Sequence, residues 1–377
     1  MDMKNILFSL IVLILVGCAA PQGAINFAER TSVDGRVMRT GIIECFEEGL
    51  SYDNGMPVYC EASAAMKIGD ELLIGIDKPV PGEALSPVFT LPIRALDEKE
   101  ITKTQLSYVL EAPFQEAAKI EAFANAGDSL FFCTTAFDRI RDTPEWDNYN
   151  TLLTWQSADY SDVGYVLPEQ NGNVISSKLV RFSLQKALAN EQFPDGPPYF
   201  KVEALTVLPG DRLIFGVREL GESYQNFDYA FILVETTLRR GAFGIMPDAN
   251  FKKIYEFKPE ANSRLLGLSD LAYQPSSNSL IALTSFEGTG DEATRDMFSY
   301  LWVLPLNKLA QNSPPIPVLT NDQPLEIPHK GEGLVMLDDR TVFVLHDEDR
   351  KMSQVETGGK TIMKKPNQAV FSIVKLR

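Results

Sequence analysis

The chain has 377 residues, of which 45% are hydrophobic and 23% charged, so it carries enough apolar side chains for a large folded core. Its 51 acidic and 35 basic residues give a net charge of −16, which argues against binding to nucleic acid or to anionic lipid headgroups. Two histidines and four cysteines, with no Cys-x-x-Cys pair, argue against a zinc site.

The start of the chain has the pattern of a secretion signal. One lysine precedes an apolar run from Ile6 to Val16, which is shorter than the roughly 20 residues that span a bilayer. The segment Leu15-Val16-Gly17-Cys18 resembles the lipobox of bacterial lipoproteins. The resemblance implies that residues 1–17 are removed and that Cys18 is lipidated and holds the chain on the membrane. The alternative is an ordinary signal peptide beside an incidental cysteine.

Two alanines follow Cys18, with no aspartate of the kind that favours inner-membrane retention. We therefore expect a cell-envelope lipoprotein, on an outer membrane and facing the periplasm. Residues 18–30 are expected to be a tether, and residues 31–377 a single domain. Export permits disulfides, and Cys45 and Cys60 would close a short loop around an Asp-Asn-Gly turn. Cys133 lies in an apolar run and is expected to be a buried free thiol.

An internal repeat organises most of the chain. Each unit has an acidic residue that opens a short apolar strand, then a turn of Gly, Asp or Asn, then a second strand, which is a hairpin pattern. The five units lie at residues 61–77, 120–132, 202–218, 269–283 and 331–345. Two more strand-like runs follow the third and fourth units. Four strands per repeat is the pattern of a β-propeller blade.

The predicted fold is therefore all-β, a propeller with five four-stranded blades. A sixth blade has room between residues 121 and 203, but residues 138–173 are better explained as an aromatic, Asp-rich insertion. The last unit ends on its third strand, at residues 369–374, and the segment 36–43 is available as its fourth. Such a strand would close the ring and remove an exposed sheet edge. Only residues 184–190 have a helical pattern, which disfavours a parallel α/β fold.

The blade motifs also carry a family resemblance. The sequences Gly-Asp-Arg-Leu-Ile-Phe-Gly-Val-Arg-Glu, from residue 210, and Gly-Glu-Gly-Leu-Val-Met-Leu-Asp-Asp-Arg, from residue 331, resemble a group of secreted bacterial β-propellers of unassigned activity. They resemble more distantly the phytase-like propellers with esterase-like activity. The likeness runs over most of residues 55–377. The phytase-like resemblance implies calcium and a phosphate-ester substrate.

Hairpin symmetry predicts which residues share a site. The first strand of each blade lines the central channel, so the acidic residues that open the blades should form a ring at one mouth. Glu203 should face Arg218 across its hairpin. By the same count the other facing pairs are Glu61–Asp77, Glu121–Thr135, Asp270–Ser285 and Glu332–Asp347. The structural alternative is that each acidic residue only accepts backbone N–H bonds from the neighbouring blade.

In a five-bladed ring the first and last blades are neighbours, which brings the two doubly acidic pairs together. Glu61, Asp77, Glu332 and Asp347 are therefore a candidate calcium site, since calcium takes several oxygen ligands. Arg218 lies across the channel as a candidate partner for an anion. The aromatic residues of the insertion could stack on a sugar or a partner, although a self-packed loop is the favoured alternative; they are Trp146, Tyr149, Trp155 and Tyr160.

The leading functional hypothesis is a lipid-anchored envelope propeller that binds a small anionic ligand or another envelope protein. No catalytic residue is assigned, because the chain has neither a Gly-x-Ser-x-Gly elbow nor a phosphate-cradling Gly-Lys-Ser/Thr loop. The alternative is a calcium-dependent, phytase-like phosphoesterase or esterase that uses the channel mouth.

Overall fold

A computed structural model describes residues 30–377, apart from 141–142, 242–243, 262–263, 287–296, 349 and 351–352. The signal segment and Cys18 lie outside the described residues, so the predicted lipidation stays a prediction. In the described part of the chain no helix is both long and apolar enough to cross a bilayer.

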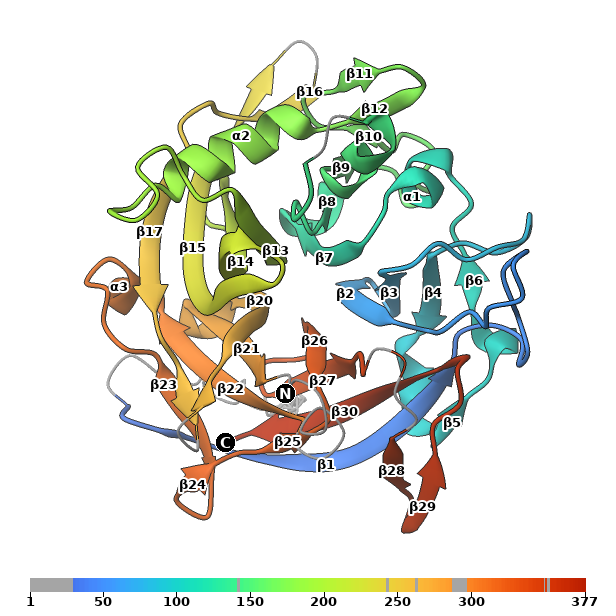
Figure 1. Ribbon diagram of the computed structural model, residues 1–377. Helices are drawn as coiled ribbons and strands as arrows, with labels where there is room; N and C mark the ends of the chain where they lie inside the picture. Colours follow the sequence, from blue (N-terminus) through green and yellow to red (C-terminus); the bar gives the residue numbers. More distant parts are fainter. Residues whose placement is uncertain are drawn as a thin grey trace, which may run out of the picture.

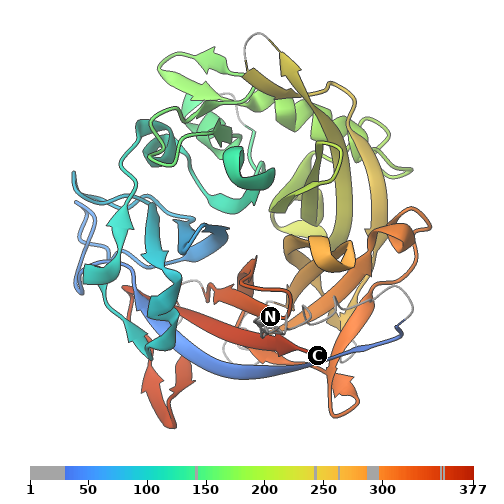
Figure 2. The same ribbon diagram turned by 180° about the vertical axis from the view of Figure 1, so that it is seen from behind.

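The protein is all-β, and its antiparallel sheets stand around a central axis (Figure 1). The same ring is seen from behind in Figure 2. Four sheets follow one another along the chain. The first sheet contains β2 (Ala62–Ile68), β3 (Glu71–Ile76), β4 (Val88–Pro92) and β6 (Ser107–Tyr108), and the second contains β7 (Ile120–Asn125), β8 (Phe131–Thr135), β9 (Leu152–Trp155) and β10 (Gly164–Tyr165). The third contains β13 (Tyr199–Leu208), β14 (Arg212–Ser223), β15 (Asn226–Gly241), β16 (Gly244–Pro247) and β17 (Lys252–Phe257). The fourth contains β20 (Gly267–Gln274), β21 (Ser279–Phe286), β22 (Phe298–Pro305) and β23 (Ile316–Thr320).

The two ends of the chain meet in the last sheet. Its strands are β26 (Gly331–Met336), β27 (Thr341–His346), β30 (Gln368–Leu376) and β1 (Val33–Glu44). β1 pairs antiparallel with β30, from Gly35 opposite Leu376 to Glu44 opposite Gln368. It also pairs in parallel with β23 of the fourth sheet and with the short strand β5 (Glu100–Ile101), which lies between β4 and β6 in the chain. The segment predicted to close the ring is therefore the strand that does so.

Shorter elements decorate the sheets. The helices are α1 (Ala112–Glu116), α2 (Lys178–Ala187) and α3 (Leu306–Leu309); the small strands are β11 (Glu169–Asn171), β12 (Val174–Ser176), β18 (Glu260–Ala261), β19 (Arg264–Leu265), β24 (Gln323–Pro324), β25 (Ile327–Pro328), β28 (Gln354–Thr357) and β29 (Lys360–Met363). Helix α2 begins six residues before the predicted segment 184–190, because Val180 and Leu184 both pack into the core beside β13.

Residues 138–173, expected to be an insertion, include two strands of the second sheet. β9 pairs with β8, and β10 with β9. The aromatic residues explain why: Trp155 is fully buried, stacks on Phe131 at 5.5 Å and packs edge-on against Phe114 at 5.3 Å. Tyr160 packs against the same indole ring. Trp155 and Tyr160 therefore pack within the protein, which was the favoured alternative to stacking on a ligand.

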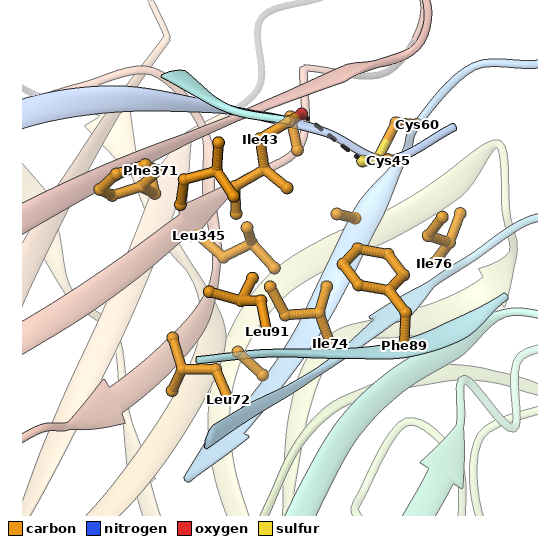
Figure 3. Packing of buried hydrophobic residues seen from close by; sticks show 14 of the residues in the cluster. Ile43, Cys45, Cys60, Leu72, Ile74, Ile76, Phe89, Leu91, Leu345 and Phe371 are labelled. Atoms are coloured by element: carbon orange, nitrogen blue, oxygen red, sulfur yellow. Dashed lines mark hydrogen bonds between the residues drawn. A yellow bond between two sulfur atoms is a disulfide. The ribbon is translucent and has the colours of Figure 1, made fainter. Parts of the chain in front are cut away.

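Apolar side chains fill the space between neighbouring sheets. Figure 3 shows the cluster between the first and last sheets, where Ile74, Phe89 and Leu345 pack together and Cys45 and Cys60 lie beside them. Cys45 and Cys60 are joined by a disulfide, as the sequence predicted, and Cys133 is a buried free thiol. Close packing near the axis needs small residues: a Cβ on Gly216 would lie 2.6 Å from the Ala204 side chain.

Candidate functional site

The five strands nearest the axis share a β-bulge. In each inner hairpin the pairing slips by one residue near the start of the first strand. The extra residues are Ser63, Glu121, Glu203, Ser269 and Glu332. A bulge leaves the extra residue outside the regular pairing and redirects its side chain. The inner strands therefore present three carboxylates and two hydroxyls from equivalent positions.

In two of the five units the acidic residue predicted to open the blade is not the bulged residue. Glu61 lies two residues before the bulged position of its unit, and Asp270 lies one residue after it. Asp270 therefore does not face Ser285: Asp270 pairs with Leu283, and Ser285 pairs with Gly267. Similarly, Thr135 pairs with Ile120 and not with Glu121.

Asp270 accepts backbone N–H bonds, which is the structural role that the sequence analysis gave as the alternative for all the acidic residues. Its Oδ1 accepts a hydrogen bond of 2.7 Å from the backbone N–H of Leu271, and its Oδ2 accepts one of 2.6 Å from the N–H of Leu334. Leu334 belongs to β26 in the next sheet, so this side chain ties two sheets together. Burial raises the pKa of Asp270 well above its ordinary value.

Three of the four predicted metal ligands converge. One oxygen each from Glu61, Asp77 and Asp347 lies within 4.8 Å of the others, and all three residues are buried. Glu61 precedes β2, Asp77 follows β3 and Asp347 follows β27. The first and last sheets are adjacent because β2 contacts β26, and this contact brings the three carboxylates to one mouth of the channel. The convergence is the one that ring closure predicts.

A lysine that the sequence analysis did not consider sits in this acidic cluster. Lys78 Nζ lies 2.8 Å from Glu61 Oε2 and 2.5 Å from Asp77 Oδ2. Arg350 Nε lies 3.5 Å from Glu61 Oε1. Burial, together with the charge of Asp77, raises the pKa of Glu61. Burial would lower the pKa of Lys78, but the two carboxylates beside it raise that pKa instead. Asp77 Oδ1 is buried and has no hydrogen-bond partner among the described residues.

Glu332, the fourth predicted ligand, belongs to a second charged group deeper in the channel. Lys330 Nζ lies 2.8 Å from Glu332 Oε1, and Lys201 forms an ion pair with Glu203 and lies 3.4 Å from Glu121 Oε1. Glu332 lies in this second group because it occupies the bulge of β26, whereas Asp347 lies just after β27, the strand that pairs with β26. It is therefore not a member of the cluster that Glu61, Asp77 and Asp347 form.

The second group follows a motif that was present in the sequence. In three units a lysine stands two residues before the bulged glutamate. These pairs are Lys119–Glu121, Lys201–Glu203 and Lys330–Glu332. The lysine and the glutamate are close in the chain and opposite in charge, so Lys-x-Glu indicates a local ion pair, and the structure has one in each of the three units. This signal would have separated Glu332 from the metal candidates.

The pKa values of the three bulged glutamates are shifted in different directions. Burial raises the pKa of Glu121 and of Glu332 well above the ordinary value. Burial would also raise the pKa of Glu203, but Lys201 and Arg218 lower it below the ordinary value. The charge of Glu203 also contributes to the raised pKa of Glu332.

Arg218, predicted as an anion partner, is held by the protein itself. Its Nη1 donates hydrogen bonds to Ser269 Oγ at 2.8 Å and to Ser285 Oγ at 3.0 Å. The guanidinium lies 5.1 Å from the centre of the Tyr229 ring, and the side chain is 1% exposed. No described residue accepts a hydrogen bond from its Nη2. Arg218 therefore balances the buried glutamates and is not open to solvent.

Comparison with known proteins gives no family. No family model matches the chain, and no curated protein matches it. Solved structures with a related arrangement include the PQQ-bound aldose sugar dehydrogenase of Streptomyces coelicolor, which is 9% identical at a TM-score of 0.38 over 92% of this chain and 99% of that one. A DUF4623 family protein from Bacteroides eggerthii is 8% identical, with a TM-score of 0.38 over 92% and 77%.

A glycosyl hydrolase from Bacteroides ovatus is 10% identical, with a TM-score of 0.38 over 84% of each chain. Similarities this low carry no argument about activity. The description of the fold therefore rests on the strand pairing of this chain, and that of the site on its own side chains.

Proposed function

We propose that this protein is a lipid-anchored, five-bladed β-propeller of the bacterial cell envelope, which binds an anionic ligand through a calcium ion at one mouth of its channel. The anchor rests on the lipobox-like segment that ends at Cys18. The blade number is supported by the five inner hairpins, which carry the same bulge, and by the order of contacts along their first strands, from β2 through β7, β13, β20 and β26 back to β2.

The observation that carries the proposal is the convergence of Glu61, Asp77 and Asp347. Three buried carboxylates whose oxygens lie within 4.8 Å of one another repel, and calcium relieves such repulsion with oxygen ligands. Within the part of the chain that the structure describes, Asp77 Oδ1 has no hydrogen-bond partner. This supports the proposal independently, because a buried carboxylate oxygen without a hydrogen bond costs free energy that a cation would recover.

Lys78 is the built-in competitor for this ion. Its ammonium group supplies the positive charge between Glu61 and Asp77 in the metal-free protein. The Lys78 side chain is 35% exposed, so it can turn into solvent when a divalent ion takes its place. Calcium has six to eight oxygen ligands, and three carboxylates leave positions for a ligand's own oxygens. A carboxylate or phosphate group is the chemistry that fits these positions.

A thermal-unfolding experiment tests the calcium site. The purified protein is stripped with a chelator and melted with increasing CaCl2. Binding at a hundredfold excess over Kd adds about 2.7 kcal/mol of stability, so we expect the Tm to rise by several degrees. Asp77→Asn should remove this response. Glu332→Gln should keep it, because Glu332 lies outside the cluster, and the exposed Asp53→Asn is a charge-matched control.

Two outcomes would change the assignment. A Tm that does not respond to millimolar calcium, or that responds equally in Asp77→Asn, would contradict the site. Calcium-dependent release of p-nitrophenol from p-nitrophenyl phosphate or acetate, lost in Asp77→Asn, would replace the binding function with the alternative of a metal-dependent hydrolase.

A further inference from the structure

The opposite mouth of the channel contains a cavity of about 680 Å³. In each inner hairpin the bulge lies near the start of the first strand and the turn follows the end of that strand. The cavity is lined by the turn-side halves of β2, β7, β13, β20 and β26. Its size lies in the range of small-molecule sites, about 300–1,000 Å³.

The floor of this cavity is apolar. Phe123, Leu205, Leu271 and Leu334 line it, one from each of four inner strands. All four are almost fully buried, so the cavity narrows onto closely packed side chains. Met66 of β2 completes the floor. A ligand that enters this mouth therefore meets hydrocarbon and an aromatic ring at the bottom.

The rim of the cavity is acidic, because the hairpin turns place carboxylates there. Asp211, Asp338 and Asp339 line the cavity, against a single lysine, Lys67. Lys67 Nζ donates a hydrogen bond of 2.9 Å to the carbonyl of Leu337, and Asp338 accepts backbone N–H bonds within its own turn. Among the described residues, the Asp211 and Asp339 carboxylates form no ion pair, so their charge is available to a ligand.

An aromatic side chain accompanies these carboxylates. Tyr273 lines the same cavity and is half-buried, and its hydroxyl donates a hydrogen bond of 3.0 Å to Asn278 Oδ1. That bond fixes the phenol ring at the end of β20. Aromatic faces attract organic cations, and they do so more strongly when the cation also has carboxylates nearby.

We propose that this cavity is a binding site for an organic cation, a substituted ammonium whose apolar body fills the floor and whose charge lies at the rim beside Asp211 and Asp339. The same rim repels anions, so phosphates and carboxylates are excluded from this mouth. The two sites lie at opposite ends of the channel, and loss of calcium binding would leave this proposal standing.

Isothermal titration calorimetry with three probes of the same ring size tests the proposal. Benzyltrimethylammonium is the cation, benzyl alcohol the neutral control and benzenesulfonate the anion. We expect binding of the cation with one molecule per chain, weaker binding of the alcohol and none of the sulfonate. Rising salt should weaken the cation's affinity, because the rim charges are exposed.

Variants locate the binding. Asp211→Asn and Asp339→Asn should each weaken binding of benzyltrimethylammonium by about two- to fivefold. Asparagine tolerates the left-handed backbone of position 211, where φ is 56°, so the fold should survive. Asp195→Asn, an exposed aspartate outside the cavity, is the charge-matched control. Three results would overturn the proposal. They are equal affinities for benzenesulfonate and benzyltrimethylammonium, unchanged binding of benzyltrimethylammonium when Asp211→Asn and Asp339→Asn are combined, and no heat from any probe at millimolar concentration.

Discussion

The opposite pKa shifts of Glu203 and Glu332 allow a prediction with opposite signs for two similar substitutions. Both side chains are buried, and Lys330 Nζ lies 2.8 Å from Glu332 Oε1. Burial favours the neutral form of Glu332, and Glu332→Gln supplies a neutral group of nearly the same shape. The amide oxygen can still accept from Lys330. Glu203→Gln instead removes the ionised carboxylate that faces Lys201 and Arg218.

The expected magnitudes follow from these contacts. Removing one partner from a buried ion pair costs about 3–5 kcal/mol, so Glu203→Gln should lower the free energy of unfolding by that amount at pH 7. Glu332→Gln should change it by less than about 1 kcal/mol, or raise it. Two ionised carboxylates 4 Å apart repel by about 4 kcal/mol at an effective dielectric of 20, and glutamine at position 332 removes any such repulsion.

The dependence on pH has the opposite sign for the two residues. The pKa of Glu332 is higher in the folded than in the unfolded chain, so its contribution to stability is full below the unfolded pKa and falls as pH rises through the folded pKa. The pKa of Glu203 is lower in the folded chain, so its contribution is present above the unfolded pKa and falls as pH decreases.

Urea unfolding of both variants and the wild type between pH 4 and pH 9 measures these effects. Glu332→Gln should flatten the loss of stability toward high pH, and Glu203→Gln should lower stability most above pH 5. Equal destabilisation by the two substitutions at pH 7, or a large loss in Glu332→Gln alone, would refute the opposite pKa shifts of Glu332 and Glu203.

Three further predictions concern the anchor and the frame. Cys18→Ser should prevent lipid attachment and release the protein from membranes, and palmitate labelling that persists in this variant would contradict the lipobox. Replacing Cys45 and Cys60 by alanine should lower the free energy of unfolding by about 3 kcal/mol, the value for a loop of about 15 residues, whereas an unchanged urea midpoint would show that the cross-link contributes nothing. Deleting residues 30–44 removes β1, so the truncated chain should lose cooperative unfolding; a melting curve like that of the parent would show that β1 does not close the ring.

Much of the frame could be predicted from residue patterns. The acidic openings and Gly/Asp turns located the inner hairpins, and the missing fourth strand of the last unit pointed to the N-terminal segment. Ring closure then predicted that Asp347 would approach Glu61 and Asp77, which it does. These inferences succeeded because hairpins and sheet edges leave a periodic mark on the sequence.

The bulges could not be predicted from that periodicity. A bulge inserts one residue without a characteristic side chain, so aligning the units by their acidic residues placed Glu61 two residues before the bulged position and Asp270 one residue after it. The partners of the carboxylates were missed for a different reason. Lys201 and Lys330 stand two residues before acidic positions and form ion pairs with them, but only the acidic residues had been aligned.

The central claim is that Glu61, Asp77 and Asp347 hold calcium, and direct calorimetric titration of the chelator-treated protein with CaCl2 tests it most directly. We predict one ion per chain in the wild type, loss of that binding in Asp77→Asn, and tighter binding in Lys78→Met, because the competing ammonium group is gone. The absence of calcium binding in both the wild type and Lys78→Met, or a stoichiometry that Asp77→Asn leaves unchanged, would contradict the account.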